Sequence, residues 1–330
     1  MRPLRHALVP RIVAVFASRQ NSRPVMRRTG SAPAVHLITT VIVFLGAAAR
    51  AQQPAAPVPP PDIFLASLDV TSGTPRVGAP MNITDRPGYD NQPGFTTDGR
   101  AVLFTSVRAD AQADIYRYDI AARRATRVTT TAPESEYSAT AIEGGRAISV
   151  VRVERDSAQR LWRFPLDGGA PTVILERVRP VGYHAWADDH TLALFVLGSP
   201  NSLQLADTRT GKADSIATGI GRSLHRVPGS RKISFVRKLS GTEWWVETLD
   251  PASRATTRLI RLPEGVEDYA WLPSGSIICG RGSTLLWWSG KSGADWQQVA
   301  DLTTAGVHGI TRLAISPQGN RIALVAEGKL

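Results

Sequence analysis

The chain has 330 residues, of which 42% are hydrophobic and 20% are charged, an ordinary balance that excludes a wholly disordered protein. The formal net charge of +11 belongs mainly to the N-terminus, because residues 1–51 contain eight Arg and no Lys, Asp or Glu. Beyond that segment, basic and acidic residues nearly balance. We therefore expect no nucleic-acid partner.

The N-terminal segment has the pattern of an export signal. Arg27 and Arg28 precede an apolar run over residues 35–49, and Ala49-Arg50-Ala51 matches a signal-peptidase site, so cleavage is expected before Gln52. The run is shorter than the roughly 20 residues of a membrane span, so we expect none after cleavage. Residues 1–51 are thus a signal peptide, with Met26 as an alternative start, and the mature protein is expected to be periplasmic or secreted.

Residues 52–62 are rich in proline and are expected to form an extended linker. Beyond them, a turn followed by a short apolar strand recurs six times, at intervals of 40 to 46 residues. The turns are marked by Gly99, Gly144, Asp189, Gly229, Gly275 and Gly319. Asp-Gly and Pro-x-Gly sequences of this kind favour hairpins, and a further pair of alternating strands follows the first five. Four short strands per unit predict the blades of a β-propeller.

The sixth hairpin is followed almost at once by residue 330, whereas residues 63–69 and 80–85 precede the first hairpin as an unmatched strand pair. We therefore predict an all-β, six-bladed β-propeller over residues 63–330. Its N-terminal strands complete the last blade, which leaves no open edge.

The first unit also resembles a known repeat. Residues 95–106 (FTTDGRAVLFTS) and 114–119 (DIYRYD) are similar to the WD40-like repeat of TolB-type propellers. This resemblance implies the six-bladed fold, and it marks a fold rather than an activity. TolB has an additional α/β domain before its propeller, so the resemblance covers the propeller part. Prolyl-oligopeptidase-like enzymes also carry such propellers, but the sequence contains no G-x-S-x-G motif.

The innermost strand of each blade faces the central channel, so the residues before each marker are candidate ligand contacts. Three to four residues upstream of an aromatic or apolar position, such as Phe95 or Trp271, lie polar side chains. We predict a ligand-binding channel mouth formed by Gln92, Glu136, Tyr137, Tyr183, His184, Arg222, His225, Asp268 and Arg312. Solvated side chains that bind nothing remain an equal alternative.

These residues favour a non-catalytic propeller that binds an envelope protein, a peptide or a glycan, as a monomer and without a cofactor. The alternative is a metal-dependent hydrolase or lyase of the lactonase-like propeller type. It would use His184, His225 and His308 with Glu136, Glu267 or Asp268 as ligands. Because these positions are not equivalent in their blades, we predict neither metal ligands nor catalytic residues.

Two further features are expected to be structural. Cys279 lies in an apolar run and is predicted to be a buried thiol. Trp244 with Trp245, and Trp287 with Trp288, are adjacent pairs whose rings face opposite ways, so one ring of each pair is expected to pack between blades. The other ring either packs as well, which we favour, or is exposed as a surface for a partner or a carbohydrate.

Overall fold

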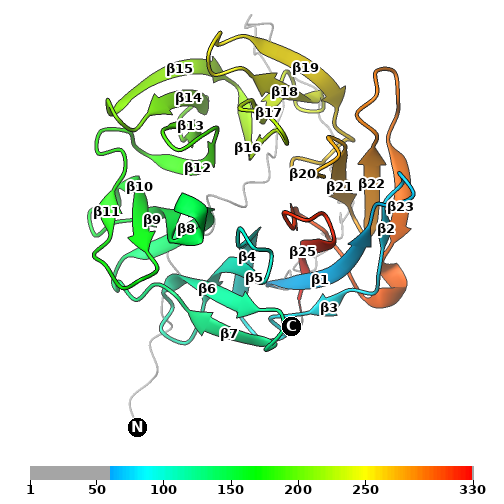
Figure 1. Cartoon of the computed structure of the whole chain (residues 1–330), viewed down its shortest axis with the longest axis horizontal. Helices are drawn as coiled ribbons and strands as arrows, with labels where there is room; N and C mark the ends of the chain where they lie inside the picture. Colours follow the sequence, from blue (N-terminus) through cyan, green and yellow to red (C-terminus); the bar gives the residue numbers. More distant parts are fainter. Residues whose placement is uncertain (1–59, 329–330) are drawn as a thin grey trace, which may run out of the picture. The chain divides into compact units, whose positions relative to one another are not determined.

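The computed structural model describes residues 60–328, which form six antiparallel sheets arranged around one axis (Figure 1). This arrangement confirms the predicted six-bladed β-propeller. The predicted signal peptide and residues 52–59 of the predicted linker lie outside the described residues. Strand β1 begins at Pro61, so the last two residues of the predicted linker belong to the propeller.

Each sheet is one blade, and we number the blades in chain order. Blade 1 is β4 (Tyr89–Phe95), β5 (Ala101–Val107), β6 (Ala113–Asp119) and β7 (Arg124–Arg127). Blade 2 is β8 (Ser135–Ile142), β9 (Ala147–Val153), β10 (Gln159–Pro165) and β11 (Thr172–Val173). Blade 3 is β12 (Val181–Trp186), β13 (Thr191–Val196), β14 (Ser202–Asp207) and β15 (Lys212–Thr218).

Blade 4 is β16 (Ile220–Arg226), β17 (Ile233–Lys238), β18 (Trp244–Leu249) and β19 (Thr256–Arg261). Blade 5 is β20 (Tyr269–Trp271), β21 (Ile277–Arg281), β22 (Thr284–Trp288) and β23 (Gln297–Asp301). Blade 6 is β24 (Arg312–Ile315), β25 (Arg321–Glu327), β1 (Pro61–Asp69), β2 (Arg76–Val77) and β3 (Met81–Asn82). The described residues also contain two short 3-10 turns, η1 (Glu143–Gly145) and η2 (Thr303–Ala305).

Blade 6 closes the ring in the predicted way. Strand β1 pairs with β25 from Pro61 opposite Glu327 to Ser67 opposite Arg321, and β2 and β3 both pair with β1. The inner two strands of this blade thus come from the end of the described chain and the outer strands from its beginning. Backbone pairing between the two ends removes the free edge that an open ring would have.

The six sequence markers all lie in the hairpin between the first two strands of a blade. At five of them the residue is glycine with a positive φ, from +66° at Gly144 to +84° at Gly275. This backbone region is accessible to glycine without steric cost, which explains why glycine recurs there.

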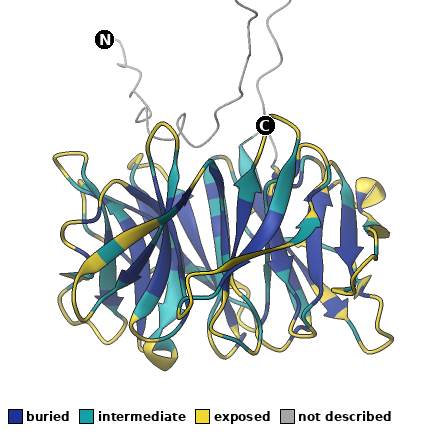
Figure 2. Cartoon of the chain, turned by 90° about the horizontal axis from the view of Figure 1, so that it is seen from above, coloured by how far each residue is buried: buried dark blue, intermediate teal, exposed yellow. Residues whose placement is uncertain are grey.

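Apolar side chains fill the spaces between neighbouring blades. On β1, Ile63 and Leu65 pack against blade 1, whereas Phe64 and Ala66 pack against blade 5. In Figure 2 the buried residues lie mainly on the strands, and the exposed residues are concentrated in the loops. Because every blade lies between two others, both faces of its inner strands are covered, whereas outermost strands such as β7 and β19 are largely exposed.

The same packing explains the tryptophan pair of β22. Trp287 packs between blades 5 and 6 and Trp288 between blades 4 and 5, so both are buried, in agreement with the favoured packing. Trp244 and Trp245 of β18 are half-buried. Cys279 is a fully buried free thiol, as predicted, and burial raises its pKa to about 12. No helix within residues 60–328 is long and apolar enough to cross a membrane.

Candidate functional site

The innermost strands are irregular at the level of the channel. β4 is bulged between Asn91 and Gly94, and β8 between Tyr137 and Thr140. Within these bulges Gln92 and Ser138 have positive φ values of +59° and +55°, which are uncommon for residues other than glycine. Bulges redirect side chains and are frequent next to binding sites. Similar register shifts occur in β12 and β16.

A fixed contact holds the first of these bulges against the second. The side-chain oxygen Oε1 of Gln92 accepts hydrogen bonds from the Thr105 hydroxyl at 2.9 Å and from the Ser138 backbone N–H at 2.8 Å. Gln92 therefore joins blade 1 to blade 2 beside the channel, which helps to offset the cost of the unusual backbone conformation.

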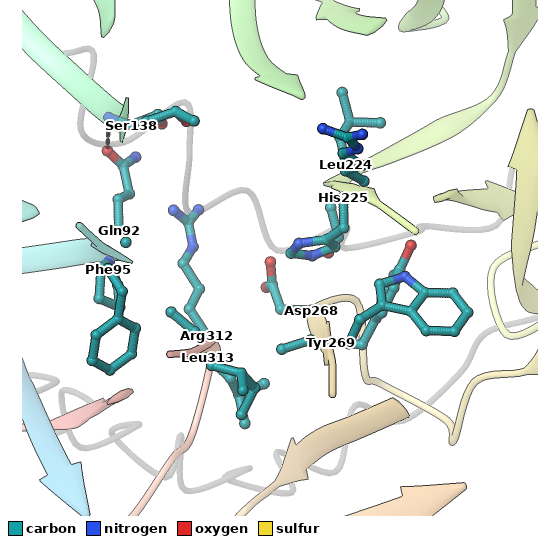
Figure 3. Close-up of a pocket in the computed structure, with 18 of the residues that line it drawn as sticks. Gln92, Phe95, Ser138, Leu224, His225, Asp268, Tyr269, Arg312 and Leu313 are labelled. Atoms are coloured by element: carbon teal, nitrogen blue, oxygen red, sulfur yellow. Dashed lines mark hydrogen bonds between the residues drawn. The ribbon is translucent and has the colours of Figure 1, made fainter. Parts of the chain in front are cut away.

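A cavity of about 470 Å³ opens on the axis and is lined by residues of the innermost strand of all six blades. Its volume falls in the range of small-ligand sites. Its lining includes seven of the nine predicted residues, Gln92, Tyr183, His184, Arg222, His225, Asp268 and Arg312. Figure 3 shows Arg312 extending between Gln92 and Ser138 on one side and Asp268 and His225 on the other.

Five of these side chains form what we call the channel floor, namely Gln92, Tyr183, Arg222, Asp268 and Arg312. Asp268 is bonded to Arg222, with 2.5 Å between Oδ2 and Nη2. Burial alone would raise the pKa of Asp268, but the positive charges of Arg222 and Arg312 outweigh it and hold the pKa below its usual value. Asp268 is therefore ionised at neutral pH.

The second arginine of the floor has a neutral partner. Arg312 donates from Nη2 to the hydroxyl of Tyr183 at 2.7 Å, and its guanidinium lies 5.1 Å from the centre of the Tyr183 ring. Only 9% of Arg312 is exposed, so its charge is almost completely removed from solvent. Arg312 nevertheless stays protonated. Burial alone would lower its pKa, but the interactions with Tyr183 and Asp268 outweigh it and hold the pKa above the ordinary value.

The three histidines considered as metal ligands each lie next to a serine hydroxyl instead. The distances from ring nitrogen to Oγ are 2.7 Å for His184 and Ser149, 2.9 Å for His225 and Ser223, and 3.1 Å for His308 and Ser283. Burial lowers the pKa of both His184 and His225 to about 4, so both rings are neutral at neutral pH. In residues 60–328 no three His, Cys, Asp or Glu side chains are grouped as metal ligands.

Two predicted residues, Glu136 and Tyr137, are not among those that line the cavity. Glu136 is fully buried between blades 1 and 2, where it accepts a hydrogen bond from the Thr131 hydroxyl and lies 3.4 Å from Nε of Arg152. Burial raises its pKa to about 7. Tyr137 is also buried, with 4% of its surface exposed.

Sequence reasoning missed the apolar part of the site. Phe95 and Trp271, which were not among the predicted contacts, line the cavity together with Leu224, Leu313 and Ile315. Phe95 and Trp271 could have been found from the sequence, because both stand four residues before a marker. Ser138 also lines the cavity, but only its bulge places it there.

No protein-family model and no curated protein sequence matches this chain, whereas many solved structures share its fold. The putative TolB from Agrobacterium tumefaciens is 15% identical, with a TM-score of 0.63 over 82% of this chain and 99% of that one. TolB from Acinetobacter baumannii is 12% identical, with a TM-score of 0.53 over 81% of this chain and 64% of that one.

An oligogalacturonate lyase in complex with manganese is 15% identical, with a TM-score of 0.55 over 80% of this chain and 86% of that one. At sequence identities this low, the similarity is evidence of a shared fold alone, because propellers of one architecture serve unrelated functions. The chain therefore has the six-bladed propeller fold that is found in TolB.

Proposed function

We propose that this protein is an exported, non-catalytic propeller that binds a protein, a peptide or a glycan at the mouth of its central channel. The observation that carries the proposal is the axial cavity, because all six blades contribute to it and it combines charged, aromatic and aliphatic side chains. A concave site with a few polar groups among apolar walls is typical of ligand recognition.

Unpartnered polar atoms around the cavity support a binding role. Within residues 60–328, the hydroxyl of Ser138 and Nδ1 of His184 are buried without a hydrogen-bond partner, and both residues line the cavity. Buried polar atoms are normally satisfied, so a ligand or water is expected to supply the missing partners. Such atoms at one cavity favour a site that is completed by its ligand.

Export is supported by the sequence of residues 1–51, with its arginine pair, apolar run and A-x-A site. We therefore place the mature protein in the periplasm or outside the cell. The lyase of similar fold was solved with manganese. A metal-dependent reaction has less support here, because His184 and His225 are already engaged with serine hydroxyls.

The test is to block the cavity without disturbing the rest of the ring. Ala314 lines the cavity and is partly exposed, so Ala314→Trp should fill it, whereas Ala122→Trp places the same ring on an exposed outer turn. The purified protein and both variants are immobilised in matched amounts. Their binding to panels of peptides and oligosaccharides is then measured by surface plasmon resonance.

We expect ligands that bind the unmodified protein and Ala122→Trp to lose binding to Ala314→Trp. Equal binding by all three proteins would place the interaction elsewhere on the molecule. Absence of binding from every panel would remove the support for a peptide or glycan ligand, and metal analysis of the same protein tests the enzyme alternative directly.

A further inference from the structure

The channel floor holds more positive charge than its own carboxylates neutralise. Asp268 is paired with Arg222. The neighbouring Glu267 lies 3.1 Å from Nζ of Lys238 and accepts the backbone N–H of Arg222 at 2.7 Å. Three cations therefore face two carboxylates, and Arg312 is the cation without an ion-pair partner within residues 60–328. The floor has one positive charge in excess.

Arg312 is placed to bind an anion. A guanidinium has five N–H donors, and the described part of the chain accepts a hydrogen bond from one of them, through Tyr183. A buried charge is costly unless it is paired, and the flat fork of arginine matches the two oxygens of a carboxylate. In Figure 3 the guanidinium extends into the open centre of the cavity. The missing partner would therefore enter from the cavity side.

The groups beside Arg312 suit the same anion. The hydroxyl of Ser138 and Nδ1 of His184 are buried, unpartnered within residues 60–328, and belong to residues that line the cavity. A hydroxyl can donate to a carboxylate oxygen that Arg312 leaves free. The glutamine that fixes the Ser138 backbone, Gln92, also lines the cavity and keeps this donor in place.

The walls above the floor indicate what the anion is attached to. Arg312 begins β24 and Ile315 ends it, so the rim lies about 10 Å above the floor at the rise of an extended strand. Between them the cavity is lined by Leu224, Leu313 and Ala270, and Phe95 and Trp271 line it further up their strands. Aliphatic walls favour an apolar side chain over the hydroxyl groups of a sugar.

We propose that the cavity binds the C-terminal carboxylate of a peptide whose last side chain is apolar, with Arg312 holding the carboxylate. The inference rests on the proposed binding function and specifies its ligand. The peptide enters from the mouth, its carboxylate pairs with Arg312 and its last side chain packs against Leu313 and Leu224. Tyr183 keeps the guanidinium oriented toward the cavity.

The first experiment needs no identified ligand and uses sodium acetate as the probe for a carboxylate. Thermal unfolding of the protein is followed in acetate and in sodium chloride of equal ionic strength. We expect acetate to raise the melting temperature of the unmodified protein and to leave Arg312→Gln unchanged, because only the former has the unpaired guanidinium. Equal responses in both salts would overturn the role of Arg312.

The second experiment measures peptide binding by fluorescence anisotropy. Labelled pentapeptides ending in leucine or phenylalanine are compared as free acids and as C-terminal amides, with trigalacturonate as a competing probe. We expect the acids to bind at least about tenfold more tightly than the amides. Arg312→Gln should abolish that difference, and Ala122→Trp should retain it.

The outcomes separate the two proposals. If the acids and the amides bind the unmodified protein equally and neither binds Ala314→Trp, carboxylate recognition is overturned. The channel would then remain the binding site. Arg312-dependent binding of trigalacturonate without peptide binding would replace the peptide by an acidic glycan. Binding that is unaffected by Ala314→Trp would overturn the proposed function itself.

Discussion

Two groups of charges, each with buried members, lie close to the innermost strands, and they are built differently. In the channel floor, Arg222 is paired with Asp268 while Arg312 contacts the neutral Tyr183, beside an open cavity. In what we call the blade 1–2 cluster, each arginine lies near two or more carboxylates. Arg127 contacts Asp110 and Asp114, and Arg152 contacts Glu134 and Glu136.

The two groups differ in how their excess charge can be neutralised, which distinguishes a binding site from a structural network. The blade 1–2 cluster is rich in carboxylates, so its excess is negative and is relieved by protonation of Glu136, whose pKa lies near 7 because it is buried. The floor has its excess on an arginine, which cannot lose its proton. A ligand is then the remaining way to neutralise it, and the floor lines a cavity that can admit one.

The largest effect is expected from removing the carboxylate of the floor. Asp268→Asn removes the carboxylate that pairs with Arg222 and whose charge also acts on Arg312. Breaking a largely buried pair in this way costs about 3–5 kcal/mol. The free energy of unfolding from urea titrations at pH 7 measures the loss. The matched control is Asp214→Asn, since Asp214 forms an ion pair with Arg254 in which both side chains are more than half exposed. That variant should lose at most about 1 kcal/mol.

Similar losses in Asp268→Asn and Asp214→Asn would mean that the floor is solvated like the surface. The contrast between a desolvated floor and the exposed pair would then disappear.

The next effect concerns pH and the blade 1–2 cluster. Burial raises the pKa of Glu136 from an ordinary 4.5 to about 7, so the folded state favours the protonated carboxyl. Its contribution to stability is complete below about pH 4.5 and is lost as the pH rises through about 7. Relative to Glu136→Gln, the unmodified protein should lose up to about 3 kcal/mol between these values.

Urea unfolding at pH 4.5, 6 and 8 tests this dependence. Glu264→Gln, which changes an exposed carboxyl, is the control and should follow the unmodified protein. If Glu136→Gln does so as well, Glu136 does not titrate in this range and the cluster does not use protonation to balance its charge.

Part of the floor could be predicted from the sequence because repeats place equivalent residues at equivalent positions. Gln92, Arg222, Asp268 and Arg312 each stand seven residues before the hairpin glycine of their blade, and all four line the cavity. The six-bladed count followed from the same spacing. Ring closure followed from the unmatched strands at the two ends, and the pairing of β1 with β25 confirms it.

The exceptions have physical causes that the sequence does not show. In blade 2, Glu136 stands one residue away from the position seven residues before the hairpin glycine. Successive side chains of a strand point to opposite sides. It therefore enters the space between blades 1 and 2. His184 meets Ser149 of the preceding blade, a contact across 35 residues that no local pattern predicts. The positive φ of Ser138 depends on a bulge rather than on its residue type.

A smaller effect is expected at the contact between blades 2 and 3. The Ser149 hydroxyl lies 2.7 Å from Nε2 of His184 and accepts a hydrogen bond from Nε1 of Trp186 at 3.0 Å. Ser149→Ala leaves these buried groups unsatisfied and should cost about 1–3 kcal/mol. Chemical denaturation measures the loss, and Ser72→Ala, at an exposed turn, should be neutral.

Peptide binding by folded Ser149→Ala distinguishes a blade contact from a ligand contact. Unchanged affinity is expected if His184 mainly joins the blades. A large loss of affinity without a loss of stability would instead make His184 a direct part of the recognition site.

The smallest effect should come from the residue that the site needs most. Without ligand, Arg312→Gln removes a buried charge that has no ion-pair partner within residues 60–328. The lost Tyr183 bond is therefore offset, and stability should change by less than about 1 kcal/mol. Arg222→Gln is the matched variant, because it leaves Asp268 without its bonded partner and should cost about 3 kcal/mol. Urea unfolding of both variants at pH 7 gives the two values.

Equal losses of stability in the two variants would mean that Arg312 supports the fold as Arg222 does, and that its charge is already balanced without a ligand. A loss confined to Arg222→Gln would leave Arg312 as a charge that the ring tolerates but does not use for its own stability.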